Sequence, residues 1–366
     1  MKYSTRLHWD LSRNRITELL EAKRAAGETI LDLTESNPTH AGFDYPSDDI
    51  LAAFHDQRNL VYEPSAKGLY SAREATGLNP ERLLLTASTS EAYAYLFKLL
   101  TDPGDEVLVP RPSYPLFEFL ATLESVKAVQ YPLFYHEGWS VDMHALAGCI
   151  TSRTRAVVLV NPNNPTGSYL NRNELEELIS ICERHSLAII SDEVFADYAF
   201  EPDPERVATL AEVTAVPTFC MSGLSKISGL PQMKLGWIHA SGPQAEESIA
   251  RLEFIADTFL SVSTPVQNAL PQLLRAGREV QAQIRARTKM NLATVPGHLH
   301  VEGGWYVTVR VPRTKSEEEW VLELLREHNI LVQPGYFYDF DSEAFLVISL
   351  LTPPGVLKKA LSHLPV

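Results

Sequence analysis

The middle third of the chain constrains the fold most, because short apolar runs alternate there with an amphipathic helix. Residues 106–110, 156–160, 187–191 and 235–240 have the length and the valine, leucine and isoleucine content of buried strands. Between the second and third runs, residues 171–186 predict a helix that begins at the capping residue Asn171. Its apolar side chains recur at helical spacing, at Leu175, Leu178, Ile179 and Cys182. A strand, a helix and a strand in this order predict βαβ units, and therefore an α/β fold with a mostly parallel sheet.

The C-terminal part of the chain has a different pattern. The elements expected there are a long polar helix at about 265–294, an alternating strand at 303–311, a helix at 316–328 and strands at 330–334 and 345–351. Helices beside a small sheet indicate a separate α+β domain. The first 44 residues are too few to fold alone, so we expect them to pack against the C-terminal part. The predicted division is a large domain at 45–262 and a small domain formed by 1–44 and 263–366.

Composition restricts the classes of partner. The 366 residues carry a formal net charge of −14, which argues against attraction to nucleic acid or to an anionic membrane. No run of about 18 apolar residues predicts a membrane span, and the N-terminal residues lack the apolar core of a signal peptide. The spacing of Cys149, Cys182 and Cys220 indicates neither a disulfide framework nor a metal site. We therefore expect a cytoplasmic protein without a bound metal.

Two stretches carry groups suited to an anionic or polar ligand. Ser88, Thr89 and Ser90 directly precede an apolar helix, whose free N–H groups and positive dipole end suit a phosphate. The alternative interpretation is a plain N-cap with Glu91 in the first turn. Further on, the loop 160–170 follows a strand, and its Asn164 amide is placed to reach a ligand oxygen. An ordinary βα loop is the alternative there.

Two ionisable residues stand in apolar surroundings. Asp192 ends a strongly apolar strand, where a carboxylate needs a cation or several donors, such as a protonated heterocyclic nitrogen. An exposed loop acid is the alternative. Lys226 lies in SGLSKISGL without a neighbouring carboxylate, and Ser225 offers a hydrogen bond without countercharge. A desolvated lysine has a lowered pKa and acts as an amine nucleophile in Schiff-base chemistry. Lys234 adds a second cation suited to phosphate.

Together these stretches supply a phosphate cradle, an amide for a phenolic oxygen, an acid for a ring nitrogen and an amine nucleophile. Pyridoxal 5′-phosphate is the common cofactor that has all of the matching parts.

At this point the chain resembles the fold-type I pyridoxal-phosphate enzymes, specifically the class I/II aminotransferases, over nearly its whole length. The segment SLSK followed by GLPQMKLGW resembles the family's Schiff-base segment, DEVF its D-E-x-Y, and NPNNPTG its NPxNPTG. The resemblance implies that Lys226 binds the cofactor covalently and moves the substrate proton, that Asp192 holds the pyridine nitrogen protonated, and that Asn164 lies beside its O3′. It implies stacking of Tyr114 on the ring. In YEPSAKGLYSARE, it implies that Tyr62 reaches the phosphate in the neighbouring subunit of a homodimer.

Several positions depart from the family pattern. Phe195 replaces the tyrosine that follows the aspartate, so its hydrogen bond to O3′ would be lost. Lys234 stands where many relatives have arginine, so a point charge replaces a bidentate fork. Val347 occupies the position of the arginine that clamps the substrate carboxylate in relatives. Arg310 is a candidate substitute, and its alternative is a solvated strand residue. Ser36, where relatives use a glycine N–H, and the adjacent Asn37 are further candidates for substrate binding.

The leading hypothesis is an aminotransferase that moves an amino group from an amino acid to a 2-oxo acid by a ping-pong mechanism. The aromatic residues Trp305, Tyr306, Tyr336 and Phe337 would line a pocket for a neutral or aromatic side chain, or form part of the small-domain core. A β-lyase or a decarboxylase with the same cofactor stays open because of Val347. A non-enzymatic binding module is the other alternative, although no basic or helix-turn-helix segment is visible.

Overall fold

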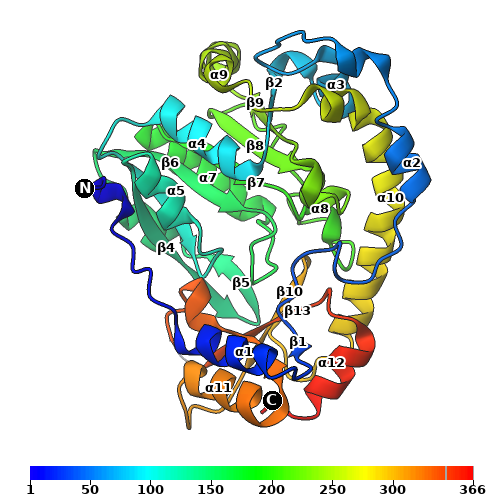
Figure 1. Cartoon of the computed structure of the whole chain (residues 1–366). Coiled ribbons are helices and arrows are strands. Elements are labelled where there is room, and N and C mark those ends of the chain that lie inside the picture. The colour runs from blue at the N-terminus through cyan, green and yellow to red at the C-terminus, as the bar shows by residue number, and fades with distance from the viewer. Residues whose placement is uncertain (343, 366) are drawn as a thin grey trace.

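The central sheet holds eight strands in the order β2-β9-β8-β7-β6-β3-β4-β5 in the computed structural model, which describes residues 1–342 and 344–365 (Figure 1). The strands are β2 (Leu83–Thr86), β3 (Glu106–Arg111), β4 (Lys127–His136), β5 (Gly138–Val141), β6 (Thr154–Val160), β7 (Ala188–Asp192), β8 (Thr218–Gly223) and β9 (Gly236–Ser241). The pairs from β8 through β7, β6 and β3 to β4 are parallel, and the outer pairs are antiparallel. The predicted α/β class with a mostly parallel sheet is confirmed.

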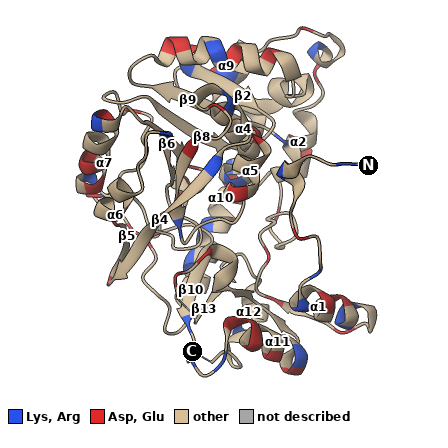
Figure 2. Ribbon diagram, turned by 90° about the vertical axis from the view of Figure 1, so that its left-hand side faces the viewer, with Lys and Arg blue, Asp and Glu red and all other residues tan. Residues whose placement is uncertain are grey.

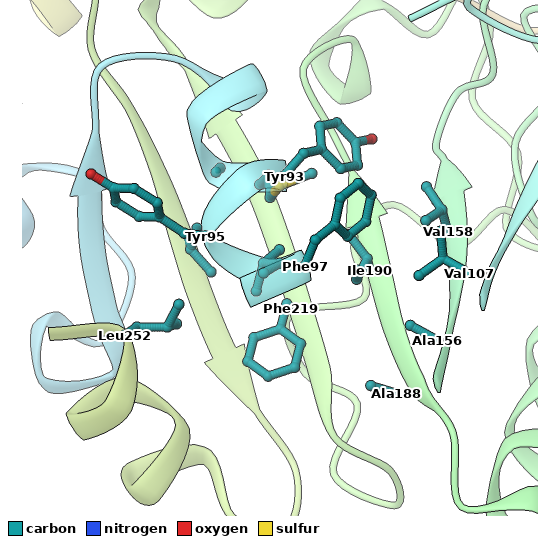
Figure 3. Close-up of a cluster of buried hydrophobic side chains, with 14 of the residues drawn as sticks. Tyr93, Tyr95, Phe97, Val107, Ala156, Val158, Ala188, Ile190, Phe219 and Leu252 are labelled. Carbon is teal, nitrogen blue, oxygen red and sulfur yellow. The ribbon is translucent and has the colours of Figure 1, made fainter. Parts of the chain in front are cut away.

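Helices cover both faces of this sheet because successive strand residues point to opposite sides. Along β6, Ala156 and Val158 pack against the helices α4 (Thr89–Leu100), α5 (Phe117–Leu123) and α9 (Ala245–Phe259). Val157 and Leu159 pack on the other side, against α6 (Met143–Gly148) and α7 (Arg172–His185). Figure 3 shows the first of these layers, in which aromatic side chains of α4 meet residues of the inner strands. The core of the large sheet therefore consists of two apolar layers.

The helix α7 begins as predicted. The side chain of Asn171 accepts a hydrogen bond from the Glu174 backbone N–H, and the Glu174 side chain accepts one from the Asn171 N–H, which forms a capping box. Leu178, Ile181 and Cys182 form its buried face. The helix connects β6 to β7, the two strands that end at the loop of Asn164 and at Asp192.

A second group of elements is built from both ends of the chain. The strands β10 (Tyr306–Arg310), β13 (Phe345–Ser349) and β12 (Gln333–Pro334) form an antiparallel sheet, and β1 (Leu31–Asp32) pairs in parallel with β11 (Ile330–Leu331). The helices α1 (Arg15–Ala25), α11 (Glu317–His328) and α12 (Pro354–Leu361) pack with these strands around one apolar cluster. In Figure 1, the blue N-terminal helix α1 lies beside the orange α11.

The long helix α10 (Thr264–Leu292) joins the two groups, close to the range that the sequence predicted. It contacts α2 (Ser47–Ala52), α3 (Tyr70–Ala75) and α8 (Leu224–Ile227) toward one end and α12 toward the other (Figure 1). Charged residues are concentrated on outer helices such as α1, α7, α9 and α11, while most of the sheet is free of them (Figure 2). No helix among the described residues is long and apolar enough to cross a membrane.

Candidate active site

A cavity of about 320 Å³ opens where the parallel strands β6, β7 and β8 end. Ligands of open α/β sheets bind at this edge, because the loops that follow parallel strands meet there. The cavity is lined by Ser36, Ser88, Thr89, Ser90, Tyr114, Phe117, Val160, Asn164, Asp192, Val194, Phe195, Gly223, Ser225, Lys226, Pro231, Lys234, Leu235, Gly236 and Tyr306. Most of the site residues predicted from sequence therefore face one space, although they come from six separate stretches of the chain, at 36, 88–90, 114, 164, 192–195 and 225–234.

Lys226 lies on the short helix α8, directly after β8. Its Nζ is 4.7 Å from the ring centroid of Trp305 and 5.5 Å from that of Phe195, so aromatic faces support the amine. Burial lowers the pKa of Lys226 to about 8, and the charge of Asp192 opposes this shift. No carboxylate of the described residues lies within ion-pair distance of this amine. The amine is therefore easier to deprotonate than an ordinary surface lysine.

Asp192 ends β7 and lines the cavity at the same edge of the sheet. The hydroxyl of Tyr93 on α4 donates to its Oδ2 at 3.1 Å, and the backbone N–H of Val194 donates to its Oδ1 at 3.2 Å. Burial raises the pKa of Asp192 to about 6, and these two hydrogen bonds oppose the rise. The carboxylate is thus fixed in position while its charge is only partly satisfied, which suits a ligand that brings a proton or a cation.

The loop after β6 is tied to the loop after β3. The amide nitrogen of Asn163 donates to the carbonyl of Pro112 at 3.0 Å, and its amide oxygen accepts from the hydroxyl of Ser113 at 2.9 Å. This tie holds together the two loops that bring Asn164 and Tyr114 to the cavity. The side-chain oxygen of Asn164 is buried without a hydrogen-bond partner among the described residues. A buried amide oxygen without a partner is uncommon and points to a bound group.

The turn at the start of α4, which also lines the cavity, has the features of a phosphate site. Ser88 caps α4 by accepting from the Glu91 backbone N–H at 3.2 Å, which leaves the hydroxyls of Thr89 and Ser90 at the start of the helix. A Cβ on Gly236 would lie 3.0 Å from the Ser222 carbonyl and 3.3 Å from the Ser88 backbone, so a glycine lets β9 approach this turn. Lys234 and Ser225 line the same cavity. Hydroxyls, helix N–H groups and a lysine together suit a dianionic group.

The structure does not bring every candidate residue to the cavity. Tyr62 is 75% exposed and lines a separate depression. The side-chain oxygen of Asn37 accepts from the backbone and hydroxyl of Thr39. Arg310 lies at the exposed end of β10, with its guanidinium carbon 5.3 Å from the ring centroid of Tyr135.

The four aromatic residues expected around a pocket have different positions. Tyr306 lines the cavity, and Trp305 is buried directly behind it with its ring below the Lys226 amine. Tyr336 is 43% exposed, and Phe337 is partly buried against the neighbouring apolar clusters. Val347 is buried in the aromatic cluster behind the cavity.

Sequence reasoning missed Tyr93 and several apolar lining residues. Tyr93 lies on the buried face of α4, where its helical spacing with Phe97 reads as ordinary core packing. Phe117, Val160, Val194, Pro231 and Leu235 are similar, because their apolar character fits any core position. Only the spatial proximity of Tyr93 to Asp192 distinguishes it, and no sequence signal reports that distance.

Comparisons with known proteins agree with this geometry. Residues 29–364 match the family model of aminotransferases of class I and II. The glutamate-pyruvate aminotransferase AlaA of Escherichia coli is 29% identical over an alignment of 365 residues that covers 91% of this chain and 89% of that protein. The tyrosine aminotransferase of Mus musculus is 26% identical, over 95% of this chain and 83% of that protein. Among solved structures, the alanine aminotransferase from Pyrococcus furiosus superposes with a TM-score of 0.86 at 26% identity, over 99% of this chain and 98% of that one.

Proposed function

Because the chain belongs to the class I and II aminotransferases, which depend on pyridoxal 5′-phosphate, we propose that the cavity around Lys226 holds this cofactor and carries out transamination. The named relatives are aminotransferases, so transamination is favoured over the β-lyase, decarboxylase and non-enzymatic alternatives. The observation that carries the proposal is the Lys226 amine, which faces the cavity with a pKa of about 8 and without an acidic partner among the described residues.

The residues present fit the cofactor. The cavity volume of about 320 Å³ lies in the range of roughly 300–1,000 Å³ that is usual for small-molecule sites. The Asn164 amide oxygen is buried without a partner among the described residues, and the N–H groups of the same amide are the donors that a phenolic oxygen needs. Ser88, Thr89 and Ser90 form a cradle at the N-terminus of a twelve-residue helix. Together with the Asp192 carboxylate, these polar groups match the phosphate, the phenolic oxygen and the ring nitrogen in kind.

Each residue then has a chemical role. Thr89, Ser90, Ser225 and Lys234 would bind the phosphate, with Ser88 also capping the helix, and Tyr114 would lie against the ring. Asp192 would keep the ring nitrogen protonated, and Tyr93 holds that carboxylate in place. When bound, the cofactor withdraws electrons from the reacting carbon and so makes its proton acidic. Lys226 would take that proton and return it on the cofactor side, because its lowered pKa lets one amine act as both base and acid.

Phe195 stands at a position where the resemblance implies a tyrosine, so the arrangement lacks that tyrosine hydroxyl. It is 4% exposed and packs edge-to-face against Trp305, Tyr306 and Tyr198, so it contributes apolar wall rather than a hydrogen bond. Asn164 is left as the side chain that contacts the phenolic oxygen in this proposal. A single neutral donor stabilises the phenolate less than two donors do.

We further propose a homodimer with shared active sites, as the resemblance implies. Leu60, Val61 and Tyr62 form an exposed apolar run, at 88%, 58% and 75% exposure. Contiguous exposed apolar residues mark interaction surfaces. In this arrangement, Tyr62 reaches the phosphate in the neighbouring subunit. The division into a large domain at 45–262 and a small domain from 1–44 and 263–366, and a cytoplasmic location, stay predictions from the sequence.

The test of the proposed function is a two-substrate assay with the cofactor-loaded enzyme. An amino acid and a 2-oxo acid should exchange their amino group with parallel-line kinetics, the signature of a ping-pong mechanism. Lys226→Ala should reduce turnover at least about 100-fold, whereas Lys289→Ala, which removes an exposed lysine paired with Glu201, should leave it unchanged. Release of ammonia from the amino acid without any acceptor would identify a lyase and contradict the proposal.

A further inference from the structure

Among the described residues that line the cavity, Lys226 and Lys234 are the cations, and neither is available to hold a substrate carboxylate in the proposed function. We propose that the preferred substrates of this enzyme carry an uncharged substituent on the reacting carbon, in the place where amino acids carry their α-carboxylate. Amino acids and 2-oxo acids remain usable as weakly bound partners in the exchange. The proposal rests on the proposed function, because it concerns the same cavity.

The charged residues that line the cavity already have other roles. Among its described lining residues, the cations are Lys226 and Lys234. The reaction itself occupies Lys226, and the proposed function assigns Lys234 to the phosphate. A substrate carboxylate would therefore enter an enclosed space without a countercharge, where an unpaired charge is costly.

The strand β13, behind the cavity, has an apolar residue at the position of interest. Val347 lies in the middle of β13, opposite Thr308 on β10 and Gln333 on β12, and is 1% exposed. It packs in one apolar cluster with Phe195 and Tyr306, which themselves line the cavity. An apolar side chain held among aromatic rings thus fills the strand position from which a cation would have to project.

The arginines of the surrounding elements have other partners. Arg111 forms an ion pair with Asp341, and the Arg287 guanidinium donates at 3.2 Å to the carbonyls of Ala41 and Leu351. Arg310 lies over the rings of Tyr135 and Phe345 at the exposed end of its strand. None of these three is among the described lining residues of the cavity.

The polar groups that do face the substrate side are neutral. Tyr306 and Ser36 bring hydroxyls to the cavity. These hydroxyls can form hydrogen bonds with an amide or a hydroxyl substituent, and they supply no countercharge for an anion.

The exchange is balanced for such a substrate. The bond between the amino nitrogen and the carbon that carries it breaks, and this carbon loses two electrons and becomes a carbonyl carbon. The same two electrons reduce C2 of the 2-oxo acid. The amino group is transferred to C2, and the carbon that carried it gains the carbonyl oxygen. No oxidant or reductant beyond the two substrates is needed.

Matched pairs of substrates test the proposal with the cofactor-loaded enzyme. L-alanine is compared with L-alaninamide, and L-phenylalanine with L-phenylalaninamide, by the second-order rate at which each converts the absorbance of the bound cofactor. The rates are corrected for the fraction of unprotonated amine. We expect each amide to react at least as fast as its acid. A fixed ionic partner for the carboxylate is worth roughly 30-fold to a few thousand-fold, so acids that react faster than their amides would overturn the proposal.

Two variants sharpen the result. Val347→Arg should raise the acid-to-amide ratio at least about tenfold, while Val347→Ile, which keeps the side chain apolar, should leave it unchanged. The wild-type ratio decides the matter even where Val347→Arg does not fold. A loss confined to the acids in Arg310→Ala would assign the carboxylate to that residue and overturn the proposal. If the proposed function is wrong, none of the compounds changes the absorbance of the bound cofactor. That result differs from the ones above and contradicts this proposal as well.

Discussion

Lys226 and Asp192 face one cavity with pKa values that burial has moved toward each other. The pKa of Lys226 falls to about 8 and that of Asp192 rises to about 6. Between these two values both groups carry their charges, and above about pH 8 the lysine becomes a neutral amine while the carboxylate stays charged. A neutral amine is the form that condenses with an aldehyde, so the surroundings of Lys226 favour cofactor capture near neutral pH.

This shift predicts the pH dependence of cofactor binding. The rate at which cofactor-free protein captures pyridoxal 5′-phosphate should rise about tenfold per pH unit below pH 8 and level off above it, because the rate follows the neutral fraction of Lys226. The measurement is the absorbance of bound cofactor after mixing at a series of pH values. A rate that keeps rising past pH 10, the usual range for lysine, would contradict the lowered pKa.

Residue type and motif alone were enough to select Lys226, Asp192, Asn164 and the hydroxyls at 88–90, because each is unusual in its local surroundings. The structure places all of them on one cavity. Tyr93 could not be selected, since a tyrosine on the apolar face of a helix looks like core until its hydroxyl is found 3.1 Å from Asp192. A functional residue in a rare local sequence pattern can be predicted from the sequence. A residue whose role follows from its distance to another side chain, such as Tyr93, cannot.

At the scale of secondary structure, the start of α4 combines two roles in adjacent hydroxyl residues. Ser88 caps the helix through its hydroxyl, whereas the Ser90 hydroxyl has no capping hydrogen bond among the described contacts and lines the cavity. The sequence left the cap and the phosphate interpretation open as alternatives. The structure supports the cap at Ser88, and the phosphate role of the turn stays a proposal.

The two serines should therefore respond differently to substitution. Ser88→Ala should lower the free energy of unfolding of the cofactor-free protein by about 1 kcal/mol, the usual cost of a lost N-cap. Ser90→Ala should leave that stability nearly unchanged but weaken binding of pyridoxal 5′-phosphate about tenfold or more, because a hydrogen bond to a charged group is lost. Denaturant unfolding and cofactor titration measure the two effects. Equal losses of stability in both variants would contradict the separate roles.

Helices and strands were predictable where apolar periodicity and capping residues indicate the same element. The α7 helix and the strands β3, β6 and β7 follow apolar periodicity and capping rules closely. The strand β4 was missed because its polar residues and Pro132 interrupt the pattern, and β8 because Cys220 and Gly223 do not have strong strand propensity. The antiparallel pairing of β9 with β2 and β8 could not be predicted either. A run of apolar residues predicts a strand but not the direction of its neighbours.

At the scale of the whole molecule, the cavity depends on segments that are distant in the chain. Ser36 and Tyr306 come from the group of elements built from both chain ends, whereas Lys226 and Asp192 come from the central sheet. The helix α10 connects these two groups along one side (Figure 1). Long-range contacts of this kind follow from packing of the complete chain, and periodicity in short windows does not report them.

The proposed homodimer makes a prediction at this scale. The cofactor-loaded protein should have twice the mass of one chain by light scattering. Tyr62→Phe should weaken binding of pyridoxal 5′-phosphate roughly 10- to 100-fold, because a hydrogen bond from the neighbouring subunit to the phosphate is lost. Binding of pyridoxal, which lacks the phosphate, serves as the control and should not change. An equal effect on both ligands would contradict a phosphate contact, and a monomer would contradict shared sites.

The most direct test of the account is to find which side chain holds the cofactor. The cofactor-loaded protein is reduced with borohydride, digested, and mapped by mass spectrometry. The account predicts that the pyridoxyl group is fixed on Lys226, in the peptide that carries residues 222–237, and that Lys226→Ala gives no fixed group. Attachment to another lysine, or no attachment in the unaltered protein, would contradict the assignment of Lys226 and with it the proposed site.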